Sequence, residues 1–339
     1  MEIDCQGCSD EVPGRTVDSP LPEHFNIAVD VCGRWAEDRS RFALYYEDEE
    51  GFTSAHTFWD IQREANRLSN VLAALGTLRG DRVAILLPQC PEAAIAQIAI
   101  YQLGAVAVPL SQRLAPDALA YRLGDSGAHL AIVDQTTQHG LLPLRQQLPE
   151  LRHVLGIGGA AGEGVRRWAE VLAHASPRYT PAATAASDPA MILYGGDTPR
   201  MPKRTLMAHC VLFGELGGYV CAHDGFPQPR DLFWSPVDWA SPDGLWKVLL
   251  PTWHFGVPLL AYKGHVDGGR AFSLMEKYGV RNCFLPLTTL SRMMAAAPEP
   301  RATYDLDLRT LTSGGEAVGQ AVLQWAREKL GVSIHEMFG

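Results

Sequence analysis

The chain has 339 residues, 47% hydrophobic and 20% charged, which suits two or three globular domains or subdomains and excludes wholesale disorder. The net charge of -9 lacks the basic field that neutralises nucleic-acid phosphates, so we expect no nucleic-acid partner. No apolar run approaches the roughly 18 residues that a membrane span needs. The acidic start of the sequence, without an apolar segment, argues against a secretory signal, so we expect none. We therefore expect a cytoplasmic chain without a membrane span.

The first part of the chain predicts a hairpin followed by alternating helices and strands. Residues 1–22 resemble a loose leader, and Thr57 with Asp60 forms a capping-box pattern at the start of a helix. The expected strands are 42–47, 52–57, 83–87, 105–110, 129–134 and 153–157, and the expected helices are 58–75, 91–103, 116–124 and 163–173. Continuously apolar strands between helices indicate parallel βαβ units, so we assign residues 23–175 to a first α/β subdomain.

The second part repeats this alternation after a Pro-rich, non-periodic stretch at residues 176–189, which we interpret as a linker. The expected strands are 191–194, 232–235, 257–262, 282–285, 308–312 and 332–337, and the expected helices are 206–221, 244–253, 270–278, 288–297 and 316–330. The prediction is an α/β protein of two βαβ-type subdomains, with mostly parallel sheets covered by helices. Residues 190–339 form the second subdomain.

Two short motifs suggest sites by spacing alone. Cys5 and Cys8 have metal-ligand spacing, but no second pair lies nearby, so we assign no metal site. Residues 156–161 match a loose G-x-G-x-x-A pattern that follows an expected strand and precedes an expected helix. A nicotinamide-dependent enzyme is the functional interpretation of this pattern, and a Gly/Ala-rich surface loop is the alternative that we favour.

A third motif lies between residues 193 and 204. A strand there runs into Gly195 and Gly196, followed by Thr198, Lys203 and an expected helix. Such a turn can direct backbone N–H groups at a phosphate, with the lysine as a point charge. An ordinary basic surface loop would have a similar composition.

This segment resembles the Y-T-S-G-T-T-G-x-P-K-G phosphate loop of adenylate-forming (AMP-binding) enzymes. Other segments are similar to acetyl- and medium-chain acyl-CoA synthetases, in family order and spacing. They are residues 22–26 and 30–35, 80–88, 103–110, 231–239, 313–316 and 336–339. The resemblance covers nearly the whole chain and implies the N-terminal part of the adenylate-forming ligase fold.

The resemblance implies an acyl-CoA synthetase-like ligase of fatty acid metabolism. ATP and Mg²⁺ convert a short- or medium-chain or aromatic carboxylic acid to an acyl-adenylate, and CoA then takes the acyl group as a thioester. The implied phosphate-binding residues are Gly195, Gly196, Thr198 and Lys203. The implied adenine-binding residues are Gly314, Gly315, Glu316, Glu336, Met337, Phe338 and Gly339. The implied acyl-pocket residues are Trp239, Gly244 and His209.

The sequence also departs from the family pattern. The family loop has small or hydroxyl residues at the positions of Asp197, Pro199 and Arg200. Glycine in such a loop lets phosphate approach the backbone, and these larger side chains do not. The chain ends at Gly339, directly after the last expected strand, so we expect a truncated form without the C-terminal domain and its catalytic lysine. The alternative function is therefore a catalytically impaired remnant, either a pseudoenzyme or a nucleotide- or acyl-binding module. An uncovered sheet edge further predicts self-association.

Overall fold

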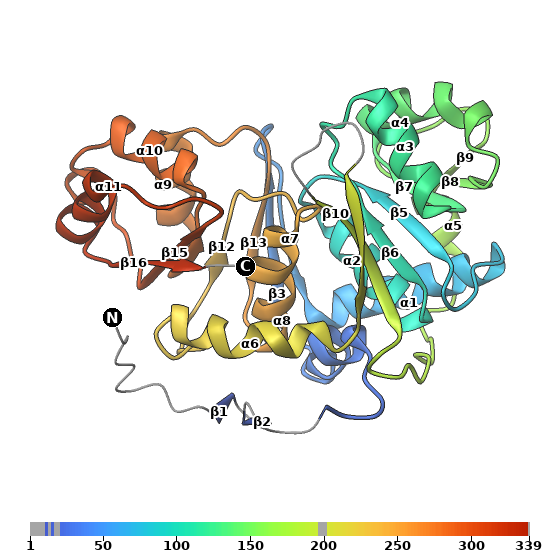
Figure 1. Ribbon diagram of the computed structural model, residues 1–339, viewed down its shortest axis with the longest axis horizontal. Coiled ribbons are helices and arrows are strands. Elements are labelled where there is room, and N and C mark those ends of the chain that lie inside the picture. Colours follow the sequence, from blue (N-terminus) through green and yellow to red (C-terminus); the bar gives the residue numbers. More distant parts are fainter. Residues whose placement is uncertain (1–10, 13–14, 17–20, 196–201, 338–339) are drawn as a thin grey trace.

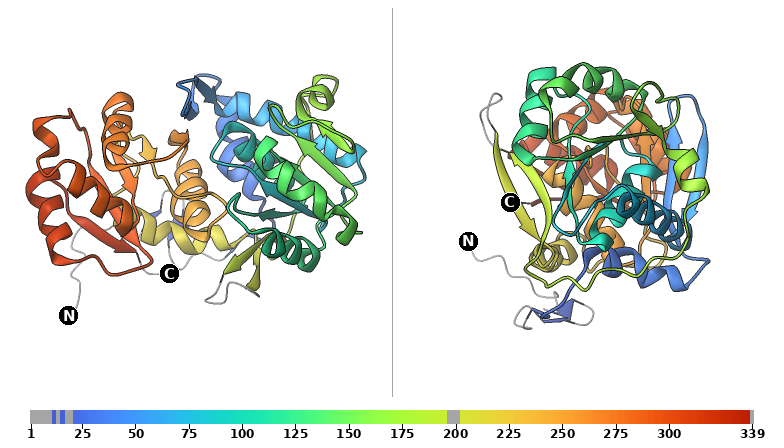
Figure 2. Two further views of the ribbon diagram at one scale, coloured as in Figure 1. Left: turned by 90° about the horizontal axis from the view of Figure 1, so that it is seen from above. Right: turned by 90° about the vertical axis from the view of Figure 1, so that its right-hand side faces the viewer.

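The chain folds into two lobes, each built on a seven-stranded sheet, which lie side by side in Figure 1 and Figure 2. The computed structural model describes residues 11–12, 15–16, 21–195 and 202–337. Both sheets are mostly parallel and carry helices, so the predicted fold class is confirmed.

The elements have the following bounds. The strands are β1 (Glu11–Val12), β2 (Arg15–Thr16), β3 (Phe42–Asp48), β4 (Thr53–Thr57), β5 (Arg82–Leu86), β6 (Val106–Pro109), β7 (Leu130–Val133), β8 (His153–Gly156), β9 (Val165–Arg167), β10 (Pro189–Gly195), β11 (Lys203–Ala208), β12 (Phe233–Trp234), β13 (Leu259–Lys263), β14 (Asn282–Phe284), β15 (Thr310–Gly314) and β16 (Ile334–Met337). The helices are α1 (Phe58–Ala74), α2 (Pro91–Leu103), α3 (Pro116–Ser126), α4 (Gln135–Leu141), α5 (Trp168–Ala173), α6 (Val211–Ala222), α7 (Pro242–Gly244), α8 (Leu250–His254), α9 (Gly268–Tyr278), α10 (Leu287–Ala296) and α11 (Gln320–Trp325). Short non-α helical segments are η1 (Val29–Gly33), η2 (Trp35–Glu37), η3 (Leu142–Gln147), η4 (Leu245–Leu249), η5 (Pro300–Ala302) and η6 (Ala326–Leu330).

The two sheets have related orders. The first is β11-β10-β6-β5-β7-β8-β9 and the second is β16-β15-β14-β12-β13-β3-β4. Within each, one edge pair is antiparallel, β10–β11 in the first and β3–β4 in the second, and the other pairs are parallel. Strands β6 and β7 are buried along their whole length, as expected for parallel strands covered on both faces.

The sheets exchange strands across the boundary predicted from the sequence. The β3–β4 hairpin, from the first part of the chain, pairs with β13 in the second sheet. Strand β10, from the second part, pairs with β6 in the first sheet. The stretch 176–189 is tied to the N-terminal segment, because Phe25 N–H donates to the Thr184 carbonyl at 3.0 Å. The sheets therefore do not follow the two consecutive segments 23–175 and 190–339.

Local signals placed several elements correctly. Thr57 and Asp60 form the predicted capping box, with Thr57 N–H donating to Asp60 Oδ2 at 3.0 Å. The mostly apolar helix α2 has the predicted bounds and ends at Gly104, whose positive φ of 73° suits glycine. Its burial on all sides explains why it lacks a polar face.

Two predicted helices begin too early. Residues 203–208 form β11, which pairs antiparallel with β10 and gives that strand a second neighbour. Residues 165–167 likewise form β9 on the edge beside β8, and the helix α5 starts only at Trp168. In both places pairing with the preceding strand prevails over local helical periodicity, because it satisfies backbone groups that an edge leaves free.

Candidate active site

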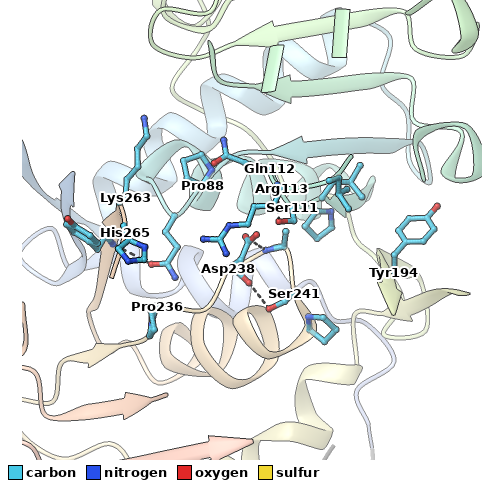
Figure 3. A pocket seen from close by; sticks show the side chains of 18 of the residues that line it. Pro88, Ser111, Gln112, Arg113, Tyr194, Pro236, Asp238, Ser241, Lys263 and His265 are labelled. Atoms are coloured by element: carbon cyan, nitrogen blue, oxygen red, sulfur yellow. Dashed lines mark hydrogen bonds between the residues drawn. The ribbon is translucent and has the colours of Figure 1, made fainter. Parts of the chain in front are cut away.

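A pocket of about 620 Å³ lies where the parallel strands of both sheets end. Residues after β5, β6, β12 and β13 line it, together with Tyr194 near the end of β10 (Figure 3). In open α/β sheets, ligands bind beyond the carboxyl ends of the strands. This pocket therefore occupies the position where the fold is expected to bind a ligand.

The pocket wall carries more cations than carboxylates. Arg113, Arg122 and Lys263 line it together with two acidic side chains, Glu49 and Asp238. Figure 3 shows Tyr194 on one side of the pocket and Lys263 on the other. A local positive potential of this kind suits an anionic ligand even though the whole chain is acidic.

Gln89 joins the two sheets beneath this pocket. Its side-chain amide, in a residue only 6% exposed, donates to the Ser235 carbonyl at 3.0 Å and the Val237 carbonyl at 2.5 Å. These carbonyls follow β12 of the second sheet, whereas Gln89 follows β5 of the first. The contact fixes the pocket floor across the boundary between the lobes.

The loop from Asp238 to Gly244 forms the lower wall. Ser241 Oγ donates to the Asp238 carbonyl at 2.7 Å and accepts from Gly244 N–H at 3.1 Å. A Cβ at Gly244 would lie 2.1 Å from the Asp238 carbonyl oxygen, so only glycine allows this close approach. Trp239 is 3% exposed in this loop, and it lines a small cavity beside the large pocket. The structure thus brings Trp239 and Gly244 together in one loop.

The predicted phosphate loop connects β10 to β11. Gly195 and Lys203 are both exposed and are cross-strand partners at the base of the loop. Gly196 and Thr198 lie outside the described residues. Tyr194 OH donates to Asp125 Oδ2 at 2.8 Å, and Arg204 donates to the Asp125 carbonyl at 2.7 Å, which anchors the hairpin to α3.

The predicted adenine side lies where β15 and β16 end. Gly314 pairs with Met337 across these strands, and Glu336 Oε1 accepts from Val318 N–H at 2.5 Å. This bond closes the turn that contains Gly315 and the exposed Glu316. Gly315 has a positive φ of 90° and open space where a Cβ would stand. The described adenine-side residues therefore form one cluster, and Phe338 and Gly339 lie outside the described residues.

Lys247 is a buried cation at this cluster that the sequence reasoning missed. Its side chain is 8% exposed and pairs with Asp243 at 2.9 Å. The ammonium lies 5.5 Å from the centre of the Phe284 ring and 3.1 Å from the place of a Cβ on Gly314. A single lysine within the apolar run 245–251 was the available signal, because buried lysines are rare unless paired.

His209 lies in the core and not in the pocket wall. It is 0% exposed, its Nδ1 accepts from Ile27 N–H at 3.2 Å, and its ring meets Tyr101 edge-on. Desolvation by burial lowers the pKa of His209 to about 4, so the ring is neutral near pH 7. Its ring contacts are with Ile27 and Tyr101 rather than with Trp239 or Gly244.

Among the described residues, the remaining sequence motifs do not form a binding site. The turn after Gly156 leads into β9 rather than into the helix N-terminus that a dinucleotide loop requires, which corrects that expectation. Cys5 and Cys8 lie outside the described residues. Within the described ranges, no group of three His, Cys, Asp or Glu side chains could hold a metal ion. In the same ranges, no helix is long and apolar enough to cross a bilayer.

Comparisons with known proteins point to one family. The family model described as AMP-binding enzyme matches residues 33–339. An acetyl-coenzyme A synthetase of Gemmatimonas aurantiaca is 30% identical in an alignment 324 residues long, which covers 86% of this chain and 48% of that protein. The chain thus spans about half the length of this curated relative.

Two solved structures share the fold. The acyl-CoA synthetase of Brucella canis superposes with a TM-score of 0.87 at 26% identity, covering 95% of this chain and 58% of that one. The anthranilate CoA ligase AuaEII, in complex with anthranoyl-AMP, superposes with a TM-score of 0.84 at 24% identity, covering 93% of this chain and 60% of that one.

Proposed function

Because the chain belongs to the AMP-binding enzyme family, we propose that it binds ATP and a small carboxylic acid and joins them as an acyl-adenylate. A carboxylate oxygen attacks the α-phosphorus, the bond to the β-phosphate oxygen breaks, and pyrophosphate leaves. The observation that carries the proposal is the pocket at the strand ends, whose lining has three cationic and two acidic side chains and includes Tyr194 of β10. Both the substrate and the leaving group are anions, so this site neutralises charge where the reaction needs it.

The proposed roles follow from position. Lys203, with Gly195 and the loop residues Gly196 and Thr198, neutralises the polyphosphate. Gly315 supports adenine binding because nothing lies within 4 Å of its missing Cβ, so a flat ring can approach the backbone. The other adenine-side residues surround it. Trp239 contacts the acid, and Gly244 allows the close packing of the loop that carries Trp239.

The second step is transfer of the acyl group to CoA. The thiol sulfur attacks the acyl carbon, the bond to the AMP oxygen breaks, and the thiol proton is released. Arg113 and Lys263 in the pocket wall suit the phosphates of such a substrate. Mg²⁺ would enter bound to the phosphates of ATP, which commonly supply several of its oxygen ligands.

A second candidate is a module that binds a nucleotide or acyl group without turnover. Asp197 in the phosphate loop favours it, because a carboxylate there repels polyphosphate. Both candidate functions require binding of the ligand, and only the ligase also requires turnover.

Calorimetric titration with Mg-ATP, followed by acid-dependent exchange of labelled pyrophosphate into ATP, tests the proposal. We expect saturable binding that Lys203→Ala weakens about tenfold, the scale of one charge-assisted contact. Lys329→Ala is the matched control, because Lys329 is a surface lysine paired with Glu299. Binding with exchange supports the ligase, and binding without exchange supports the module. No binding by a folded sample contradicts both.

A further inference from the structure

A small cavity lies beside the large pocket, between α2 and the loop after β12. It measures about 10 Å³, which is room for one water-sized oxygen. Pro109 and Ala240 line both this cavity and the large pocket, so the two spaces share a wall. The two spaces therefore adjoin, with these two residues at their boundary.

Two polar side chains line this otherwise apolar cavity. Gln97 is 2% exposed and Trp239 is 3% exposed. Gln97 Oε1 and Trp239 Nε1 have no hydrogen-bond partner in the part of the chain that the structure describes. Buried polar atoms are nearly always paired, so an unpaired acceptor and an unpaired donor on two residues that line the same small cavity indicate a missing partner.

The two unpaired atoms, Gln97 Oε1 and Trp239 Nε1, determine which chemical group could be the missing partner. Tryptophan only donates through its indole N–H, and the glutamine carbonyl only accepts. A hydroxyl satisfies both atoms with one donor and one acceptor. An ammonium group could not accept from Trp239, a carboxylate would repel Gln97 Oε1, and a methyl group would leave both atoms unpaired. A buried water typically makes about three hydrogen bonds, and the other lining side chains are apolar.

We propose that Gln97 and Trp239 form a hydroxyl-binding subsite, and that the acid taken by the large pocket is a small hydroxy-substituted carboxylic acid. This inference rests on the proposed function. Trp239 Nε1 donates to the hydroxyl oxygen, and the hydroxyl proton is donated to Gln97 Oε1. A site built to pair a substrate hydroxyl discriminates strongly against the analogue that lacks it, because its own polar atoms are then left unpaired.

Matched pairs of acyl-sulfamoyl adenosines test the subsite by calorimetry with the full chain. The pairs are benzoyl against its 2-, 3- and 4-hydroxy forms, and butanoyl against 3-hydroxybutanoyl. We expect at least one hydroxylated mimic to bind at least about tenfold more tightly than its parent. Equal affinity within every pair overturns the subsite and leaves the proposed function standing. Absence of binding by all mimics overturns both.

Two variants locate the preference. Trp239→Phe and Gln97→Met keep most of the side-chain volume and remove the donor or the acceptor, so each should abolish most of the preference, measured as the ratio of the two affinities within a pair. Trp246→Phe is the matched control, because Trp246 also has a buried, unpartnered Nε1 but does not line the cavity. A preference that survives both cavity variants contradicts the assignment. If no pair of mimics shows a preference and both variants melt at higher temperatures than the unmodified chain, the cavity holds only a trapped water. That result overturns the proposed subsite. The preference of the unmodified chain remains decisive if a variant does not fold.

Discussion

The adenine side and the phosphate side of the candidate site are held in different ways. On the adenine side, Gly314 packs directly against the Met337 backbone, and Lys247 lies buried beneath it. On the phosphate side, Gly195 and Lys203 are exposed, and the hairpin is anchored at its base through Tyr194 and α3. We infer that substitutions on the adenine side cost stability, whereas those on the phosphate side cost mainly ligand affinity.

Low pH should reduce the stability of both sides, because each side has one buried histidine. Burial lowers the pKa of His223, whose Nδ1 lies 2.8 Å from Thr310 Oγ1 in β15, to about 3. His209, directly after β11, has a pKa of about 4. Because both values lie below the ordinary 6.5, the unfolded chain binds more protons in this range, and stability falls as the pH falls from 6.5 toward 4. Each histidine accounts for up to about 3 kcal/mol.

Urea unfolding between pH 7 and pH 4 measures this loss. His209→Gln keeps an acceptor for Ile27 N–H and should reduce the pH slope by about one proton, while the His223 contribution remains. An unchanged slope in this variant contradicts the assignment of His209 as a buried neutral ring.

Gly314→Ala should destabilise the chain by about 1–3 kcal/mol, the range for overpacking a fixed site. Its Cβ would lie 2.7 Å from the Met337 carbonyl oxygen, which is backbone and cannot rotate away. Gly214→Ala in α6 is the control, because nothing lies within 4 Å of its Cβ position, and it should be neutral or slightly stabilising. Thermal unfolding compares them, and equal melting temperatures would show that the adenine side is not tightly held.

Lys203→Ala should leave the free energy of unfolding within about 0.5 kcal/mol, because the side chain is exposed. Its effect should instead appear as the loss of Mg-ATP affinity described above. Urea unfolding and calorimetry on the same sample separate the two quantities. A stability loss comparable to that of Gly314→Ala would remove the distinction between the two sides.

Tyr194→Phe should have a small effect that is confined to the β10–β11 hairpin. It removes the hydroxyl that donates to Asp125 at the base of the hairpin, worth about 1 kcal/mol or less at this half-buried position. Amide hydrogen exchange in β10 and β11 should accelerate while exchange in β15 stays unchanged. Faster exchange in β15 as well would mean that the two sides unfold together.

The sequence was sufficient for most elements because their signals are local. The capping box of α1, the apolar strands β5 to β7 and the glycine end of α2 need only neighbouring residues. The strand exchange between sheets was missed, because it depends on residues far away along the chain. The strand β11 was missed although it pairs with the strand just before it, because its last residues were assigned to the following helix. The predicted domain boundaries and the proposed roles of the site residues remain predictions.

The candidate site was predictable only where a motif carries it. The glycines of the adenine side and Lys203 stand in recognisable sequence patterns. Gln97 and Lys247, by contrast, resemble ordinary residues of apolar helices, and only tertiary packing gives Gln97 a cavity and Lys247 a place beneath Gly314. Burial and proximity of this kind are not encoded at any fixed spacing.

A crystal structure of the full chain with 4-hydroxybenzoyl-sulfamoyl adenosine tests the central claim most directly. The account predicts adenine against Gly314 and Gly315, the sulfamoyl group toward Lys203, and the acyl group beside Trp239. Electron density for the ligand elsewhere, or none at saturating concentration, would contradict it.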